Sequence, residues 1–122
     1  MRGMNKVVLI GHIGQVPELR FSKEGVPWSS LRVATERRKK NGEDWVAETD
    51  WHTVKVFKQQ AEQCQKWLKP GSVVAIEGSI NYDRWKDKDS GMNRIRSAVV
   101  ADRVTFITTP VRNDQGNDVS VA

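Results

Sequence analysis

The chain has 122 residues, enough for one domain with its own core and too few for two, and its one cysteine excludes an internal disulfide. Nineteen basic and thirteen acidic side chains give residues 1–110 a net charge of +6, which favours a phosphate-rich partner. No apolar run approaches the roughly 20 residues of a membrane span and no signal-peptide pattern opens the chain, so we expect a soluble intracellular protein.

The first predicted strand begins with the β-branched run at residues 7–10. Gly11 and Gly14 follow it, and glycines inside a strand are typical of bends, bulges and barrel corners. We therefore expect this strand to bend or bulge before the chain continues toward residues 19–21.

The second predicted strand covers residues 28–35, where Leu31 and Val33 alternate with polar side chains and are expected in the core. The connection at residues 36–44 is polar and contains an Asn-Gly turn signal, which predicts a long hairpin between the second and third strands. Four consecutive cations, residues 37–40, are expected at its tip.

Residues 45–57 form the third predicted strand, whose successive side chains point to opposite faces. Val54 and Val56 fall on one face, whereas Trp51 and Phe57 fall on the other, with Lys55 between them. Aromatic rings beside a cation fit single-stranded nucleic acid, whose bases stack on such rings at roughly 1–3 kcal/mol each. The alternative interpretation is that these rings fill a second small core.

Residues 59–69 are the one predicted helix, with apolar side chains at helical spacing and a Pro-Gly stop signal after it. Cys64 and Trp67 lie on the apolar stripe, so we expect both in the core. This position indicates a structural thiol rather than a nucleophile at Cys64.

A fourth strand is predicted over residues 72–85 and a fifth over about 94–107. Alternation along the fourth strand places Trp85 on its polar face. From Pro110 onward the chain is polar and without periodicity, so we expect a domain at residues 1–109 and a short flexible tail at residues 110–122.

Five strands, a long hairpin between the second and third, and a helix between the third and fourth match the order of the oligonucleotide-binding (OB) barrel. The predicted fold class is therefore all-β with one helix. The sequence contains no pattern that indicates a catalytic or metal site. No pair of His or Cys has metal-ligand spacing, and the Asp-rich segment at residues 87–91 does not follow the calcium-loop pattern. We expect no enzymatic activity, no cofactor and no metal.

The chain resembles the bacterial and mitochondrial type of single-stranded DNA-binding protein. The Thr-Asp-Trp-His-Thr-Val segment at residues 49–54 is similar to that family's Thr-Glu-Trp-His signature. The other matching segments are residues 4–7, 9–11, 17–21, 31–35, 68–72, 76–78 and 100–104, together with Phe57 and Trp85.

The resemblance implies that Trp51, Phe57 and Trp85 stack on bases, and that His52 contacts another subunit of a homotetramer. Basic side chains close to the rings in the sequence are our candidates for phosphate contacts. They are Arg37, Arg38, Lys39, Lys40, Lys55, Arg84, Lys86, Arg94 and Arg96.

The chain departs from the family pattern at three places. Lys39 stands where many members have a further stacking tryptophan, and Trp28 stands where the family usually has a small or aliphatic residue. The ring of Trp28 has two interpretations, packing or an additional stacking surface. Residues 111–122 lack the acidic tail with an apolar tip through which bacterial members recruit other enzymes, so the sequence leaves open whether this chain recruits replication or repair enzymes.

The expected function is the binding of single-stranded DNA with little sequence preference, which protects the strand during DNA replication, recombination and repair. The expected location is the bacterial cytoplasm with the nucleoid, or alternatively the mitochondrial matrix. The rival interpretation is an OB-fold accessory subunit, primosomal or RNA-binding, that acts mainly through protein contacts. Stacking and backbone contacts discriminate DNA from RNA poorly.

Overall fold

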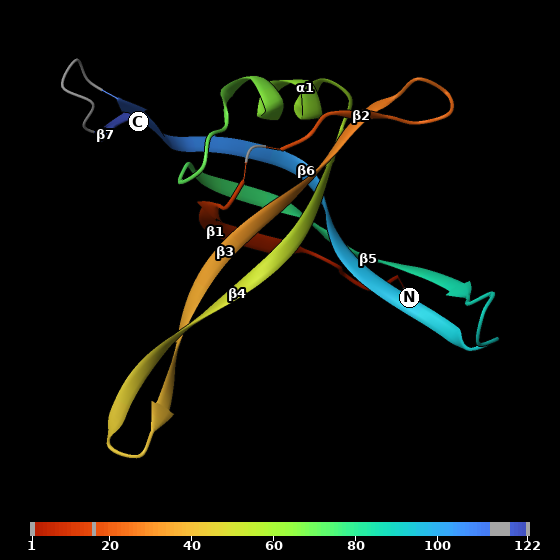
Figure 1. Ribbon diagram of the computed structural model, residues 1–122, viewed down its shortest axis with the longest axis horizontal. Helices are drawn as coiled ribbons and strands as arrows, with labels where there is room; N and C mark the ends of the chain where they lie inside the picture. The colour runs from red at the N-terminus through yellow and green to blue at the C-terminus, as the bar shows by residue number, and fades with distance from the viewer. Residues whose placement is uncertain (1, 16, 113–117, 122) are drawn as a thin grey trace.

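The computed structural model describes residues 2–15, 17–112 and 118–121 of the chain. Five of its strands and one helix correspond to the predicted elements (Figure 1). In chain order the elements are β1 (Val7–Ile13), β2 (Arg20–Phe21), β3 (Pro27–Asn41), β4 (Asp44–Phe57), α1 (Lys58–Trp67), β5 (Val73–Lys86), β6 (Asn93–Arg112) and β7 (Asp118–Val121).

The strand pairings close into a ring. β1 pairs with β5, β5 with β6, β6 with β4, β4 with β3, and β3 returns to β1. All of these pairs are antiparallel except β4 with β6, which run parallel at Val54 and Lys55. This order is that of the predicted OB barrel.

Glycines without room for a side chain allow the strands to turn around the ring. A Cβ on Gly11 would collide with the carbonyl of Ala34, at the point where β1 leaves β5 and begins to pair with β3. A Cβ on Gly78 would collide with the carbonyl of Val100, beside a register shift between β5 and β6. The predicted bend in the first strand therefore lies at a barrel corner, where backbone approaches backbone.

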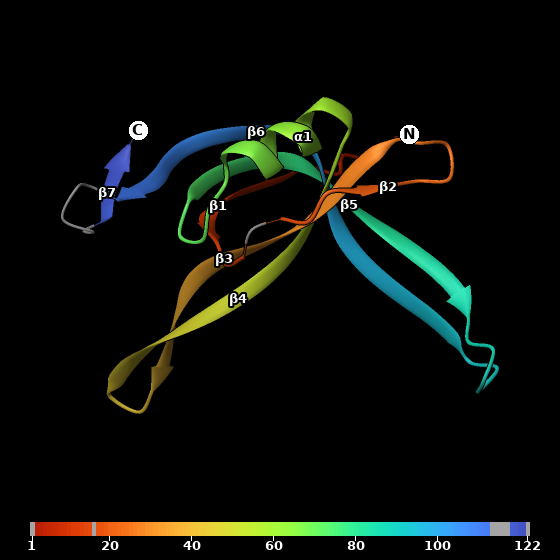
Figure 2. The same cartoon turned by 45° about the horizontal axis from the view of Figure 1, so that its top comes forward.

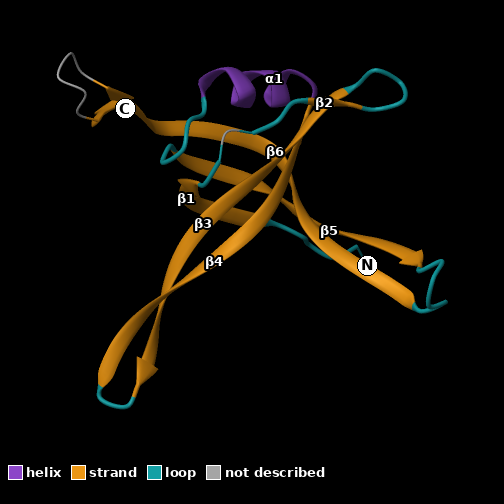
Figure 3. Cartoon of the chain, in the orientation of Figure 1, coloured by secondary structure: helices purple, strands orange, loops and turns teal. Residues whose placement is uncertain are grey.

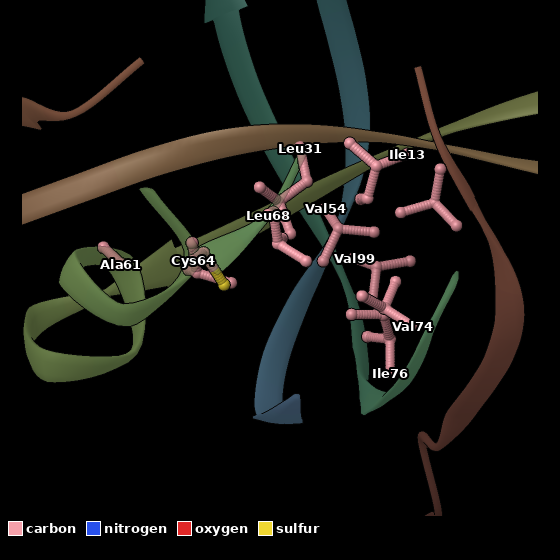
Figure 4. Packing of buried hydrophobic residues seen from close by; sticks show 11 residues of the cluster. Ile13, Leu31, Val54, Ala61, Cys64, Leu68, Val74, Ile76 and Val99 are labelled. Atoms are coloured by element: carbon pink, nitrogen blue, oxygen red, sulfur yellow. The ribbon is translucent and has the colours of Figure 1, made fainter. Parts of the chain in front are cut away.

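The core fills the ring and extends under the helix. Leu31, Val33, Val54 and Val56 are buried as the alternation predicted. Figure 4 shows side chains from several strands converging beside Leu68, with Cys64 approaching from α1. Each fully buried aliphatic side chain of this kind contributes roughly 1.5–3 kcal/mol to folding.

Helix α1 covers one end of the ring, as Figure 3 shows in purple. The prediction that Trp67 lies in the core is wrong, because its side chain is 54% exposed and the Lys66 ammonium lies 5.1 Å from its ring centroid. Ala61 and Cys64 are the buried residues of α1, and Leu68 is buried directly after the helix ends. At about 100° per residue, Trp67 lies about 60° beyond Cys64 and about 120° from Ala61, so it falls outside the buried side of the helix.

Two long ribbons extend beyond the ring and diverge from each other (Figure 2). One is the β3–β4 hairpin and the other is the β5–β6 hairpin. In the first, pairing continues without interruption to Asn41 and Asp44, so residues 37–40 belong to β3 rather than to the predicted loop. The cations therefore lie on two faces of a ribbon, not together at a tip.

At the C-terminal end, β6 continues to Arg112 and pairs with Asp118–Val121. Part of the predicted tail at residues 110–122, namely residues 113–117 and 122, lies outside the described residues. The predicted domain boundary after residue 109 stays a prediction. No helix of the described residues is long and apolar enough to span a membrane.

Candidate nucleic-acid interface

Strand β4 places two of the predicted stacking rings on the outside of the barrel. Val54 and Val56 are buried, whereas Trp51 is 49% and Phe57 is 41% exposed. Lys55 lies between the two rings on their side of the strand, as the two-residue alternation predicted. These rings do not fill a second core within this chain.

Strand β5 presents the third ring. Val74 and Ile76 point into the core, and the alternation then places Trp85 on the outer side, where it is 43% exposed. The Lys55 ammonium lies 3.6 Å from the Asp83 carboxylate, which is on the same side of β5 as Trp85. We call the side of the sheet that carries Trp51, Phe57 and Trp85 the aromatic face, and the other side of the two ribbons the reverse face.

The Trp51 ring lies directly over Gly14. A Cβ built on Gly14 would lie 2.7 Å from the Cη2 and Cζ3 atoms of that ring. A hollow of about 420 Å³ adjoins the ring and is lined by Gly14, Gln15, Arg32 and Trp51. The absence of a side chain at Gly14 therefore fixes how closely the indole approaches the barrel.

The four cations of β3 divide between the two faces. Arg38 pairs in register with Ala47, and Lys40 with Trp45, so both cations lie on the aromatic face. The Lys40 ammonium lies 6.0 Å from the centroid of the Trp45 ring, which is 60% exposed. No ion pair joins Arg38 or Lys40 to a carboxylate of the described residues.

Arg37 and Lys39 lie on the reverse face and meet carboxylates there. Arg37 Nη2 lies 2.8 Å from Glu48 Oε2, and Arg37 Nε donates a 2.9 Å hydrogen bond to Asp50 Oδ2. Lys39 Nζ lies 3.7 Å from Glu48 Oε1. The hydrogen bond and the charge of Asp50, followed by the charge of Glu48, raise the pKa of the Arg37 guanidinium above its ordinary value.

The cations of the second ribbon divide in the same way. Arg96 and Arg94 pair in register with Asp83 and Trp85 and share the aromatic face, and the Arg96 guanidinium lies 5.2 Å from the Trp85 ring centroid. Arg84 and Lys86 follow the other alternation on the reverse face, where Arg84 lies 5.6 Å from the centroid of the Tyr82 ring.

The turn after Trp85 holds Arg94 in place. Two nitrogens of Arg94 donate hydrogen bonds of 3.3 and 3.2 Å to Asp87 Oδ2. The backbone N–H of Asp89 donates to the other carboxylate oxygen at 3.0 Å. The pKa of Asp87 is lowered chiefly by the Asp89 N–H and further by Arg94 and Ser90, so the carboxylate stays charged and anchors Arg94 at neutral pH.

Three comparisons with known proteins bear on the family and the fold of the chain. A profile of the single-strand binding protein family matches residues 4–107. The chain belongs to the single-strand binding protein family. It is 35% identical over 107 residues to the single-stranded DNA-binding protein of Xylella fastidiosa (strain Temecula1), covering 87% of this chain and 65% of that relative. The chain thus spans about two thirds of the length of the curated relative that it matches.

A solved structure shares the fold of this family member. The Plasmodium falciparum SSB complex with ssDNA superposes with a TM-score of 0.76, covering 88% of this chain and 97% of that one at 23% identity. The OB fold predicted from the order of the elements is confirmed.

His52, the predicted subunit-contact residue, lies on the reverse face of β4. Its Nε2 atom lies 2.8 Å from the Thr35 hydroxyl oxygen, so the ring is held toward β3 and away from the aromatic face. A role in subunit contact stays a prediction. Among the described residues, no group of three His, Cys, Asp or Glu side chains is arranged to hold a metal ion.

Sequence reasoning did not select Arg20 and Arg32, although both belong to this interface. Arg32 lines the hollow beside Trp51, and its Nη1 donates a 3.1 Å hydrogen bond to the Thr53 hydroxyl. Arg20 is paired in register with Trp28. The alternation along residues 28–35 identifies the face of Arg32, whereas the position of Arg20 depends on how β2 pairs with β3, which the sequence pattern does not fix.

Proposed function

We propose that this chain binds single-stranded DNA with little sequence preference, by stacking bases on Trp51, Phe57 and Trp85. The observation that carries the proposal is the aromatic face itself, on which three half-exposed rings from two strands lie among cations. Water-exposed indoles gain free energy when a base covers them, at roughly 1–3 kcal/mol per base. Family membership and the name of the Xylella relative support the same activity.

The phosphates are proposed to follow the cations of the aromatic face. Of the predicted candidates these are Arg38, Lys40, Lys55, Arg94 and Arg96. The other four candidates, Arg37, Lys39, Arg84 and Lys86, lie on the reverse face, away from the three rings, so we assign those four no phosphate contact. Stacking and phosphate contacts read no base edges, which accounts for the low sequence preference.

We infer that the protein acts by binding alone, without catalysis, and protects single strands during replication, recombination and repair. The assembly that we propose is a homotetramer in which His52 lies at a subunit contact. Its position on the reverse face, away from the three rings, is compatible with simultaneous DNA binding. A bacterial relative supports a location in the bacterial cytoplasm with the nucleoid.

The test is intrinsic tryptophan fluorescence during titration with oligothymidylate, compared with a duplex of equal length. We expect quenching by the single strand and little response to the duplex, whose bases are already stacked. Trp51→Ala and Trp85→Ala should each weaken binding by roughly 1–3 kcal/mol. Trp67→Ala is the matched control, because Trp67 is 54% exposed but lies on α1.

Losses below about 0.5 kcal/mol for both Trp51→Ala and Trp85→Ala, in folded variants, would refute the stacking assignment. Absence of any binding to single strands by the native protein would refute the function as a whole. The accessory-subunit interpretation, in which protein contacts are the main activity, would then explain the chain better.

A further inference from the structure

Trp28 lies in a row of three neighbouring side chains on the aromatic face. In the strand register, Trp28 of β3 is opposite Arg20 of β2 on one side and opposite Phe57 of β4 on the other. Side chains directly opposite in such pairs have Cβ atoms about 5 Å apart. The half-buried Trp28 ring therefore continues the aromatic surface that begins with Phe57, and the Arg20 guanidinium lies 5.8 Å from its centroid.

A hollow of about 330 Å³ adjoins this ring, and we call it the Trp28 hollow. Trp28 is the one aromatic residue among those that line it. Among the described residues, four cations line it as well, Arg20, Arg32, Lys55 and Arg96, against a single carboxylate, Glu18. The volume is within the range of sites that bind small molecules, roughly 300–1,000 Å³.

The excess of positive charge around the Trp28 hollow favours an anionic ligand. The Lys55 ammonium forms an ion pair with the Asp83 carboxylate at 3.6 Å, and the Arg20 guanidinium forms one with the Glu18 carboxylate at 3.4 Å. Arg32 and Arg96 have no ion pair with a carboxylate of the described residues. Like charges that converge on one site repel each other, and a phosphate placed among them would offset that repulsion.

The Trp28 hollow also lies between the rings already assigned to base stacking. Arg32 lines both this hollow and the one beside Trp51. Arg96 lines the hollow and lies 5.2 Å from the centroid of the Trp85 ring. A strand that passes from Trp51 to Trp85 along these cations therefore crosses the hollow.

We propose that the Trp28 hollow binds one nucleotide of the single strand, with its base against the Trp28 ring and its flanking phosphates on Arg20, Lys55 and Arg96. This inference rests on the proposed function and adds a fourth stacking position to it. A ring present only for packing explains the position of Trp28 opposite Phe57, but it gives no reason for four cations around the same hollow.

Photochemical cross-linking tests the proposal on the native protein. Oligothymidylate that carries 5-iodouracil is bound, irradiated and digested with trypsin, and the conjugated peptides are identified by mass spectrometry. Cleavage after Lys and Arg separates the three sites, because Trp28 falls in residues 24–32, Trp51 in residues 41–55 and Trp85 in residues 85–86. We expect conjugates on all three peptides.

Conjugates on residues 41–55 and 85–86, with none on residues 24–32, overturn the Trp28 hollow and leave the proposed function intact. No binding of the oligonucleotide, and so no conjugate, overturns both. The two failures are therefore distinguishable in one experiment.

Affinity measurements on Trp28→Leu and Trp28→Phe separate stacking from packing. Leucine retains apolar volume without a planar ring, so Trp28→Leu should weaken binding at least about fivefold, the lower end of the stacking range. Trp28→Phe retains a ring and should stay within about threefold of the native protein. Equal losses in both variants, or native affinity in both, contradict a stacking role.

Should Trp28→Leu fail to fold, Arg20→Gln on the exposed β2 strand provides a second variant. We expect the slope of log affinity against log salt concentration to fall by about 0.7 in this variant. An unchanged slope contradicts the phosphate contact of Arg20.

Discussion

The four cations at residues 37–40 of β3 divide between two faces, and this division leads to a prediction about salt dependence. Neutralising Arg38 and Lys40 together removes two cations from the aromatic face, where they pair in register with Ala47 and Trp45. Neutralising Arg37 and Lys39 changes the net charge of the chain equally but acts on the reverse face. The variants Arg38→Gln/Lys40→Gln and Arg37→Gln/Lys39→Gln are therefore matched in charge and act on opposite faces.

The size of the effect follows from counterion release. Each phosphate neutralised on a single strand contributes about 0.7 to the slope of log affinity against log salt concentration. Loss of two contacts lowers the slope by about 1.4 per chain, and over the fourfold change from about 50 to 200 mM salt this amounts to a factor of about seven. The reverse-face variant should change the slope by less than about 0.3, because it breaks contacts with Glu48 and Asp50 rather than with phosphates.

The assay is a fluorescence titration with oligothymidylate at four or more salt concentrations, with circular dichroism to show that both variants are folded. Equal slopes in the two variants would refute the face argument, whichever value they share. A larger loss in the reverse-face variant would show that the strand follows the Glu48 side of the ribbon instead.

Two further predictions concern the barrel. Gly14→Val should displace the ring of Trp51, since a Cβ at residue 14 would lie 2.7 Å from that ring. We expect this variant to weaken oligothymidylate binding about as much as Trp51→Ala does, while its circular dichroism spectrum stays native. Unchanged affinity would contradict the close approach of the Trp51 ring to Gly14. Burial raises the pKa of the Cys64 thiol to about 12, so iodoacetamide at pH 8 should alkylate the urea-unfolded chain readily and the native chain hardly at all. The pKa of Cys64 in the folded chain lies above its unfolded value of about 9. The contribution of the neutral thiol to the free energy of unfolding is therefore complete below pH 9 and is lost as pH rises toward 12. Urea unfolding at pH 8 and at pH 10.5 measures this loss.

The faces of β4 and β5 were predictable because burial constrains one side of each strand. Val54 and Val56 cannot leave the core without exposing apolar surface, and the two-residue period then fixes where Trp51 and Phe57 point. The same reasoning along β5 placed Trp85. A local pattern is sufficient here, since each of these positions depends only on the strand to which it belongs.

The length of the first ribbon was not predictable in this way. The connection at residues 36–44 was expected to be a loop because it is polar and contains an Asn-Gly turn signal. In the structure, Arg37 and Lys39 meet Glu48 across the ribbon, so cross-strand pairs compensate the charge and the strand continues. That compensation depends on register, which a single strand does not reveal. The burial of Trp67 was predicted wrongly, and the role of Trp28 was left open, for a related reason. Both depend on which side chains pack beside the ring, and the sequence pattern does not reveal these neighbours.

Pairing on one face and not on the other makes the ribbon electrically asymmetric. Glu48 and Asp50 balance Arg37 and Lys39 on the reverse face of the β3–β4 ribbon, so that side of this ribbon presents little net charge. The aromatic face keeps Arg38 and Lys40 uncompensated beside an exposed Trp45. The uncompensated cations of this ribbon therefore lie on the side that carries the rings. Sequence composition alone gives only the net positive charge of the chain. The cross-strand register explains why a phosphate backbone would follow one face of the ribbon and not the other.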